Sequence, residues 1–533
     1  MSIDSAPVVN VDRVLGGGPF CELGWRGAMA ESGDGTLIVA AGAFRLPQWH
    51  GHDVSRRSRP NPGWFPIGIY RAADLTCLSL FTVRWPVNAI SFHPSLPLVA
   101  IGAGSYDGGW MYDGELLILD LTADSMVSVL EYPREVRRVS WRDDETLDLV
   151  LAVRDDEAAE EAGTTSVACS VRRDDWDRAT ERMLKAPYDD EKPVHDETPG
   201  GQIATSRPLS RQAVWALHAL PDGRILAGLD GVALECWSRS SAEPLWRIPA
   251  EGTGCQIRVL PDGRTALALT STRTYETTIM KEVDLEAGVA PVTFELFFPA
   301  VMASSVDGWV SFRDTAHDAR AGTGMIHLLT PEGTHGGTVQ VGGYDLFNHF
   351  FDIRHSPQLL FLQGNPDEPW RDKWVVALDG RQRRVRRLFP LEWDGHRGGH
   401  LFGGSGVYLE DARGPALVHS GAVHNGAGLL PGNAFVVRRA FPSGEAQWVF
   451  AADHQATAVD VDGDSELVYV TFNNGELVAL RAADGTVHGR QRLRVGGHPV
   501  VPMSLTYVGS GRLAIGTLDG RILDCSYGGK SLA

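Results

Sequence analysis

The stretch VWALHALPDGRILAGL at 214–229 shows how this chain folds locally. Two runs of mostly apolar residues flank Pro221-Asp222-Gly223, whose Asp and Gly tolerate the backbone conformations of a tight turn. Alternation of apolar and polar residues is typical of strands, so the stretch predicts a β-hairpin. CQIRVLPDGRTALALT at 255–270 and VPMSLTYVGSGRLAIG at 501–516 repeat the phrase.

A second two-strand phrase follows each hairpin, as in GELLILDLTADSMVSVL at 114–130 and GELVALRAADGTVHGRQRL at 475–493. Together the two phrases predict a four-stranded antiparallel meander. Such a sheet cannot bury both faces alone, and its recurrence every roughly 40–60 residues is typical of propeller blades. The hairpin turns lie near residues 34, 95, 144, 222, 262, 306, 356, 410, 464 and 511.

These repeats predict an all-β fold, a β-propeller of four-stranded antiparallel blades. We expect about seven to ten blades, in one large ring or in two fused propellers, because the weak phrases near 34, 306 and 410 are either blades or insertions. Residues 1–533 form one repeat domain with an insertion at 171–212, or two propellers split near 171–212.

The segment PVVNVDRVL at 7–15 is expected to close the fold. The last repeat ends near Tyr527, after its third strand, which leaves room for an outer strand donated from the N-terminal side. That pairing would remove two exposed strand edges. DRATERMLKA at 177–186 is the best candidate for a helix.

Charge and composition exclude several classes of function. The 49 Lys and Arg against 67 Asp and Glu give a net charge of −18, which disfavours nucleic acid and anionic membrane surfaces as partners. No apolar run reaches the roughly 18–20 residues of a membrane span, and from the first residues we expect no signal peptide. The six scattered Cys include no CxxC pair, so we expect reduced thiols and a cytoplasmic protein.

Several short motifs are similar to those of known repeats. DGVALECWS at 230–238 resembles the end of a WD40 repeat, Gly497-His498 and Asp519-Gly520 resemble its Gly-His and Asp-Gly positions, and ALRAADG at 479–485 resembles a quinoprotein-like repeat. The sequence therefore resembles the WD40/quinoprotein-like β-propeller superfamily over almost its whole length. In a WD40 blade, His, Asp and Trp join in a structural hydrogen-bond network. The resemblance implies structural roles for His498, Asp519, Asp230 and Trp237.

The long loops point to one binding face. In each meander the connection between the second and third strands (b–c) leaves the disc on the opposite side from the tight a–b and c–d turns. Six long segments are predicted b–c loops, and function is commonly carried by loops on a rigid scaffold. They span 44–66, 104–114, 154–165, 313–324, 364–373 and 420–433.

Aromatic residues in these loops are the candidate partner-binding residues. Exposed Trp and Tyr are favoured interface anchors, although the rings can also fold back over their own loops. We therefore expect a non-enzymatic cytosolic interaction scaffold or regulatory subunit that binds a protein or peptide through the b–c face. The candidates are Trp49, Trp64, Tyr106, Trp110, Tyr112 and Trp370.

The alternative is a propeller enzyme, a metal-dependent hydrolase, lactonase or lyase, with its site at the central channel. His50 and His52 in WHGHD at 49–53 could share a metal ion, but loop packing is the default interpretation. No nucleophile elbow, phosphate loop or dinucleotide fingerprint stands in a usable context. We therefore predict no catalytic, cofactor-binding or metal-binding residue and no cofactor.

Overall fold

The structure is a computed structural model of the chain. The described residues are 8–44, 65–106, 110–185, 191–194, 211–250, 252–271, 277–296, 300–314, 324–342, 353–365, 368, 371–392, 400–424, 434–464 and 466–527.

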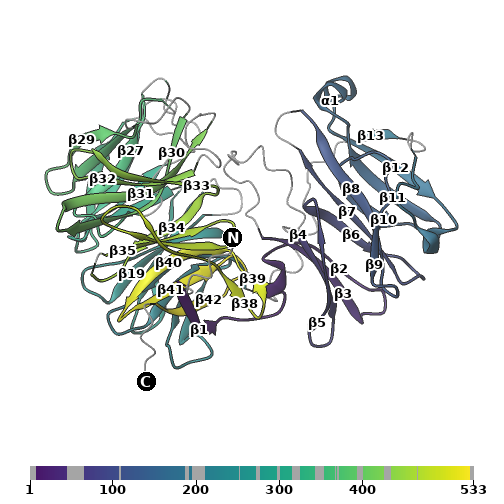
Figure 1. Cartoon of the computed structure of the whole chain (residues 1–533), viewed down its shortest axis with the longest axis horizontal. Helices are drawn as coiled ribbons and strands as arrows, with labels where there is room; N and C mark the ends of the chain where they lie inside the picture. The colour runs from purple at the N-terminus through teal and green to yellow at the C-terminus, as the bar shows by residue number, and fades with distance from the viewer. Residues whose placement is uncertain are drawn as a thin grey trace. The chain divides into compact units, whose positions relative to one another are not determined.

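Antiparallel sheets of three to five strands build almost the whole described chain (Figure 1). Nine of the ten predicted hairpins form as paired strands, including those near 34, 306 and 410. Near 356 the strands Ile353–Arg354 and Leu359–Gln363 do not pair with each other. The predicted all-β propeller architecture is therefore confirmed, and the three weak phrases are blades. No helix in the described segments is both long enough and apolar enough to cross a membrane.

The chain divides into two compact units. The larger contains Arg211–Ala533 and the N-terminal segment Met1–Gly17, while the smaller contains Gly18–Pro47 and Ser58–Ser210. The smaller unit is thus inserted between the first strand of the larger unit and the rest of it. The division after Ser210 falls inside the segment 171–212.

Three four-stranded sheets form the smaller unit, and their first strands contact one another in succession. Two buried clusters lie between neighbouring sheets, one on each side of the middle sheet. The sheets are β2 (Trp25–Glu31), β3 (Leu37–Ala43), β4 (Phe65–Arg71) and β5 (Cys77–Val83); β6 (Val87–Phe92), β7 (Leu98–Tyr106), β8 (Tyr112–Asp120) and β9 (Ser125–Ser128); and β10 (Val136–Trp141), β11 (Thr146–Ala152), β12 (Ser166–Arg172) and β13 (Lys192–Val194).

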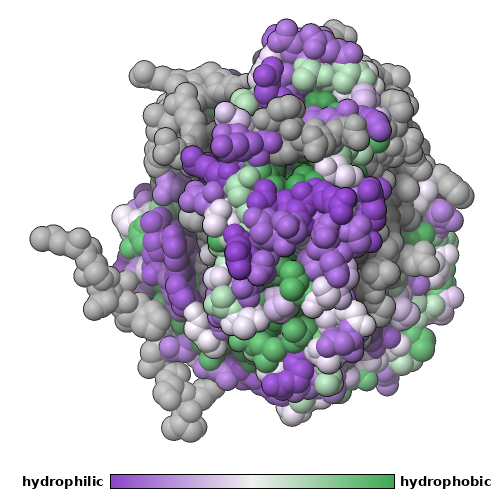
Figure 2. All heavy atoms as spheres, turned by 90° about the vertical axis from the view of Figure 1, so that its right-hand side faces the viewer, coloured by the Kyte–Doolittle hydropathy of each residue, from purple (hydrophilic) through white to green (hydrophobic). Residues whose placement is uncertain are grey.

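Propeller rings use four or more blades, so three sheets are too few to close a ring. The outer faces of the first and third sheets are therefore not covered by another sheet of this unit, and each is protected in its own way. On the first sheet, Phe20 and Leu23 pack with Tyr70 in an apolar cluster, and the Phe20 and Tyr70 rings are 4.5 Å apart. On the third sheet, the outer face is polar, with Asp148 bonded to Ser170 and Arg142. Figure 2 looks at this side and shows hydrophilic side chains, in purple, gathered across it.

Seven sheets of three to five strands form the larger unit within the described residues, with a two-stranded ribbon of β38 (Arg494–Val495) and β39 (His498–Pro499). β26 precedes β27 in the chain but pairs in parallel with β30, so it belongs to the fifth sheet and the fourth sheet has three strands. The strands of the seven sheets are β14 (Val214–Ala219), β15 (Ile225–Leu229), β16 (Val232–Trp237) and β17 (Trp246–Pro249); β18 (Thr253–Val259), β19 (Thr265–Ser271), β20 (Thr278–Asp284) and β21 (Val289–Leu296); β22 (Ala300–Ser304), β23 (Val310–Asp314), β24 (Met325–Leu329) and β25 (His335–Gln340); β27 (Leu359–Gln363), β28 (Trp374–Asp379) and β29 (Arg384–Pro390); β26 (Ile353–Arg354), β30 (His400–Asp411), β31 (Gly414–His424), β32 (Ala434–Ala440) and β33 (Ala446–Ala452); β34 (Ala456–Val461), β35 (Leu467–Phe472), β36 (Glu476–Arg481) and β37 (Val487–Arg492); and β40 (Pro502–Gly509), β41 (Arg512–Thr517) and β42 (Ile522–Tyr527).

A buried apolar cluster lies between each successive pair of these sheets. The cluster between the last sheet and the first contains Leu15, Val214, Ala514 and Ile522, so the succession closes on itself. As expected, β1 (Val9–Leu15) pairs antiparallel with β42 and becomes the outer strand of the last sheet.

Ion pairs reinforce this closure. The buried Asp524 of β42 forms an ion pair with Arg512 at 2.6 Å and accepts a 3.2 Å hydrogen bond from Arg239, which follows β16 of the first sheet. Arg512 also pairs with Asp12 of β1 at 3.0 Å. One carboxylate therefore connects the last sheet with the first, and its guanidinium partner holds the closing strand.

The helix predicted over 177–186 is wrong. Only Trp176–Arg178 forms a single 3-10 turn, and Arg182 has a φ of 57°, which ends helical geometry. The backbone N–H of Leu184 instead donates to Val129 at 2.9 Å, because Trp176 and Leu184 are buried against the second and third sheets. The α-helix of the described chain, α1 (Asp156–Ala162), lies in a segment expected to be a loop.

Replacing Asp524 with Asn should loosen the closure. The change leaves Arg512 and Arg239 without their shared charge, which costs roughly 3 kcal/mol for a buried pair, or about a hundredfold in the opening equilibrium. Amide hydrogen exchange of β1 and β42 measures that opening. Arg172→Gln, which breaks an exposed pair with Glu145, is the control and should leave exchange nearly unchanged. Equal exchange in both variants would show that the ion pairs are not needed.

Candidate functional site

The six long segments occupy equivalent places in their sheets. Each connects the second strand with the third, so within each unit they leave the sheets at the b–c end. One further long connection, between β12 and β13, returns along the sheets to that same end, where Glu191 pairs with Arg134 at 2.9 Å. The long connections therefore gather at the b–c end of the sheets, whereas the a–b turns are short.

In the smaller unit, the b–c loops of the second and third sheets join into one surface. Met111 forms a β-bridge with Asp155, and the N–H of Asp156 donates to the carbonyl of Trp110 at 3.2 Å. The Tyr106 hydroxyl donates to Asp156 Oδ2 at 2.7 Å. We call Tyr106, Trp110, Met111, Tyr112 and α1 the loop platform.

Apolar side chains of the loop platform are unusually exposed. Trp110 is 51% exposed, Met111 41% and Tyr106 39%, although all three are large enough to be favoured in cores. The Tyr106 and Tyr112 rings lie 4.7 Å apart, and the Arg137 guanidinium lies 5.3 Å from the centre of the Tyr112 ring. The rings are thus fixed in place while their outer surfaces remain open to solvent.

A local capping motif explains why α1 forms in this loop. The Asp155 carboxylate accepts the N–H of Ala158, and Gly163 ends the helix with a φ of 63°. The Ala158 N–H and the neighbouring Arg154 lower the pKa of Asp155, so it remains a charged cap. Glu157, Glu160 and Glu161 give α1 an acidic exposed side.

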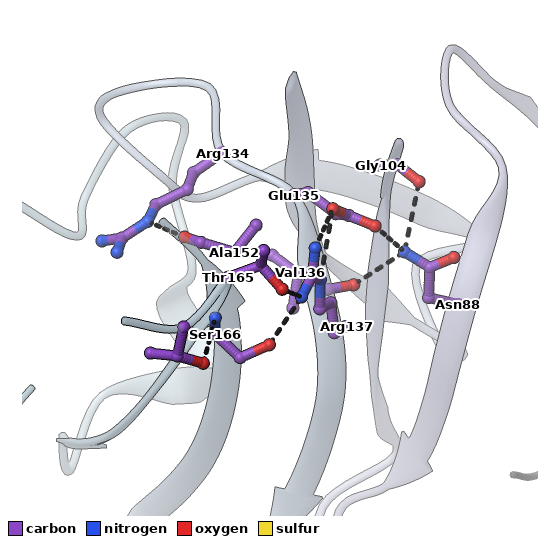
Figure 3. Close-up of polar contacts among 10 residues, drawn as sticks. Asn88, Gly104, Arg134, Glu135, Val136, Arg137, Ala152, Thr165 and Ser166 are labelled. Carbon is purple, nitrogen blue, oxygen red and sulfur yellow. Dashed lines mark hydrogen bonds and ion pairs between the residues drawn. The ribbon is translucent and has the colours of Figure 1, made fainter. Parts of the chain in front are cut away.

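A buried ion pair supports the platform from below. Glu135 and Arg137 are each more than nine-tenths buried and approach to 3.2 Å. Figure 3 shows Arg137 between Glu135 on one side and Thr165 and Ser166 on the other, at 2.8 and 2.6 Å. Asn88 of β6 donates to the carbonyls of Gly104 and Val136 at 3.2 Å each, which ties the second sheet to the third.

The electrostatics of this pair are dominated by burial. Burial raises the pKa of Glu135, while the Arg137 guanidinium and the Asn88 amide oppose that rise. Burial also raises the pKa of Tyr112, helped by the nearby Asp156. The arrangement can hold the loops rigidly, and its donors and acceptors are directed at one another more than at solvent.

The interior of the larger unit contains a second polar cluster. Arg354, in β26 of the fifth sheet, pairs with Asp460 of β34 at 2.9 Å and donates to the carbonyl of Leu217 of β14 at 3.0 Å. The N–H of Tyr507 of β40 donates to the same carboxylate at 2.9 Å. Burial alone would raise the pKa of Asp460, but Arg354, His355 and the Tyr507 N–H lower it to about 2. One Arg side chain therefore connects the first, fifth and sixth sheets.

No metal centre is evident in the described part of the chain, where no three His, Cys, Asp or Glu side chains gather as ligands. His50 and His52 lie outside the described residues. Asp460 is already engaged by a guanidinium and backbone N–H groups, so its position suits a structural tie.

The structure brings three of the predicted partner-binding residues together: Tyr106, Trp110 and Tyr112 form the loop platform. Trp49, Trp64 and Trp370 lie outside the described residues. A role of these six residues in binding a partner stays a prediction.

The four residues assigned structural roles lie in separate places. His498 is exposed, whereas Asp519 is buried with Thr517 and Arg521. Asp230 accepts the Trp215 indole N–H at 2.7 Å, and Trp237 is buried beneath the Arg211 guanidinium. The structural roles remain predictions, with partners different from those of a WD40 network.

Sequence reasoning missed Glu135, Arg137, Asn88 and Asp156, which build and support the platform. Arg137 and Arg138 are adjacent and look alike in sequence, but a β-bulge between Val136 and Arg138 turns Arg137 inward. The Asp155 to Gly163 spacing was the one available signal, since it fits a short capped helix.

Comparison with known proteins adds no relative. No family model matches the chain, and no curated protein matches its sequence. Inferences about function therefore come from the chain's own residues and their geometry.

Replacing Arg137 with Met should destabilise the platform. Glu135 would be left buried without its counter-ion, which costs roughly 3–5 kcal/mol. Because the pKa of Glu135 is already raised, the deficit should be largest at neutral pH and shrink as falling pH protonates the carboxylate. Amide exchange of β10 and α1 between pH 5 and 8 measures the effect. Arg142→Met, at an exposed pair, is the control, and a pH-independent deficit would contradict the assignment.

Asp460→Asn should lower the free energy of unfolding of the larger unit by an amount that depends on pH, because it removes the buried ion pair with Arg354. The wild-type carboxylate has a lowered pKa, so its contribution is present above the unfolded value of 3.8 and is lost as the pH falls toward 2. Urea unfolding should show a wild-type advantage on the order of 2 kcal/mol at pH 5 that disappears near pH 2. Asp453→Asn, at an exposed position, is the matched control. A constant difference over this range would exclude the tie.

Proposed function

We propose that this chain is a non-enzymatic interaction scaffold or regulatory subunit of the WD40/quinoprotein-like β-propeller type, acting in the cytoplasm. It binds a protein or peptide partner through its b–c loops. The observation that supports this most is the loop platform, where two neighbouring loops hold an exposed Trp, Met and Tyr on a rigid base.

Rigidity is the physical reason to prefer binding. Large aromatic side chains bury much area on contact and lose little rotamer freedom, especially when a structure already holds them in place. Here Tyr106 is fixed by Asp156 and Tyr112 by Arg137, so little ordering cost remains for a partner to meet. The buried carboxylates beneath are neutralised by Arg, which suits support more than catalysis.

Trp110→Ala should weaken partner capture. An anchor of this kind commonly contributes roughly 2 kcal/mol or more, a loss of at least about thirtyfold in affinity. Affinity purification from the native host with quantitative mass spectrometry compares wild type and variant. Leu245→Ala, which removes a 52% exposed side chain from a c–d connection of the larger unit, is the control. A partner retained equally by both variants would refute a role for the platform.

A further inference from the structure

The outer strand of the first sheet of the smaller unit has an unprotected edge. β5 ends the order β2-β3-β4-β5, so within the described residues no strand pairs with its outer side (Figure 1). Its sequence CLSLFTV has no charge and no proline. Leu78 and Leu80 are 46% and 37% exposed. An exposed edge of this kind is a template for another strand, and proteins usually guard against it.

The other outer strands of the described sheets are guarded. Charged side chains occur in β1, β13, β17, β21, β29 and β37, and four of these also contain a proline. The four-residue β9 is short, and β25 exposes His335, Thr338 and Gln340. Like β9 and β25, β33 is uncharged, but it exposes Gln447 and Ala451 beside Val449, with the Arg490 guanidinium 5.9 Å from the Phe450 ring. Among the outer strands of the described sheets, β5 therefore stands out because it is seven residues long, has no charge or proline, and exposes two leucines.

The exposed leucines extend an apolar surface. Leu80 lies opposite Gly68, and the Tyr70 ring occupies the space that a side chain at Gly68 would need. Tyr70 belongs to the apolar cluster with Phe20 and Leu23 on the outer face of this sheet. A strand added beside β5 would thus find both open backbone groups and apolar side chains at alternate positions.

The geometry points to strand addition by a partner: β5 takes up an extended peptide with apolar residues at alternate positions and no charge along the paired stretch. A second copy of the chain fits less well. Two seven-residue strands contribute far fewer than the roughly 20–30 residues per side of a stable interface, and each copy carries a net charge of −18. Main-chain hydrogen bonds supply affinity to a single peptide strand, and alternate side chains supply selectivity.

A capped peptide of alternating Thr and Val, flanked by Ser-Gly, is the probe, and the full chain is the receptor. We expect the peptide to slow amide exchange over Leu78–Val83. The same peptide N-methylated at alternate bonds keeps its side chains but cannot extend the ladder, and should give no protection. Leu80→Lys should weaken binding about tenfold, as expected for losing the burial of one Leu side chain. Val449→Lys on β33 is the matched control and should leave affinity unchanged.

Unchanged exchange of β3 and β4 in Leu80→Lys would verify that the sheet is intact. Absence of protection at millimolar peptide, or equal protection by the N-methylated peptide, would overturn strand addition. A dimer seen by light scattering without peptide, and dissociated by Leu80→Lys, would assign the edge to a second copy and overturn the proposal. None of these outcomes depends on Trp110, so they test β5 separately from the loop platform.

Discussion

The fold depends on covering both faces of every sheet. A four-stranded meander has two broad faces, and burying only one leaves too little apolar area to offset the cost of ordering the chain. The larger unit meets this constraint by arranging seven sheets so that the last covers the first. The cluster of Leu15, Val214, Ala514 and Ile522 at that junction is as buried as the clusters elsewhere. The pairing of β1 with β42, the Asp524 ion pairs and the Arg354–Asp460 ion pair all stabilise this closed succession of sheets.

The smaller unit meets the same constraint without a ring. One end face is covered by Phe20 and Leu23, and the other replaces apolar side chains with Ser170, Asp148 and Arg142, which water can solvate. Terminal repeats of open arrays use polar outer faces for the same reason. With the sheets fixed in this way, the b–c connections are free to vary, and the loop platform is one product of that freedom.

Much of this arrangement could be predicted from sequence. The Pro-Asp-Gly and Gly-Ser-Gly turns located the hairpins, and the missing fourth strand after Tyr527 identified the role of 7–15. The sequence left one ring and two propellers split near 171–212 as alternatives, because both units use the same hairpin phrase and differ only in which sheets share a core. The Glu135–Arg137 ion pair could not be predicted from the sequence, because a single bulged residue decides which of two adjacent Arg side chains is buried. The short α1 carries too few turns for a helical period to show.

The pairing of β1 with β42 imposes an order on biosynthesis. Asp12 and its partner Ser526 are separated by 514 residues, so β1 leaves the ribosome about 25–100 s before its partner at roughly 5–20 residues per second. Throughout that interval the nascent chain carries a solitary strand at one end and a growing stack with an uncovered sheet at the other. Translation speed and chaperone access in that window therefore govern how many molecules reach the closed form.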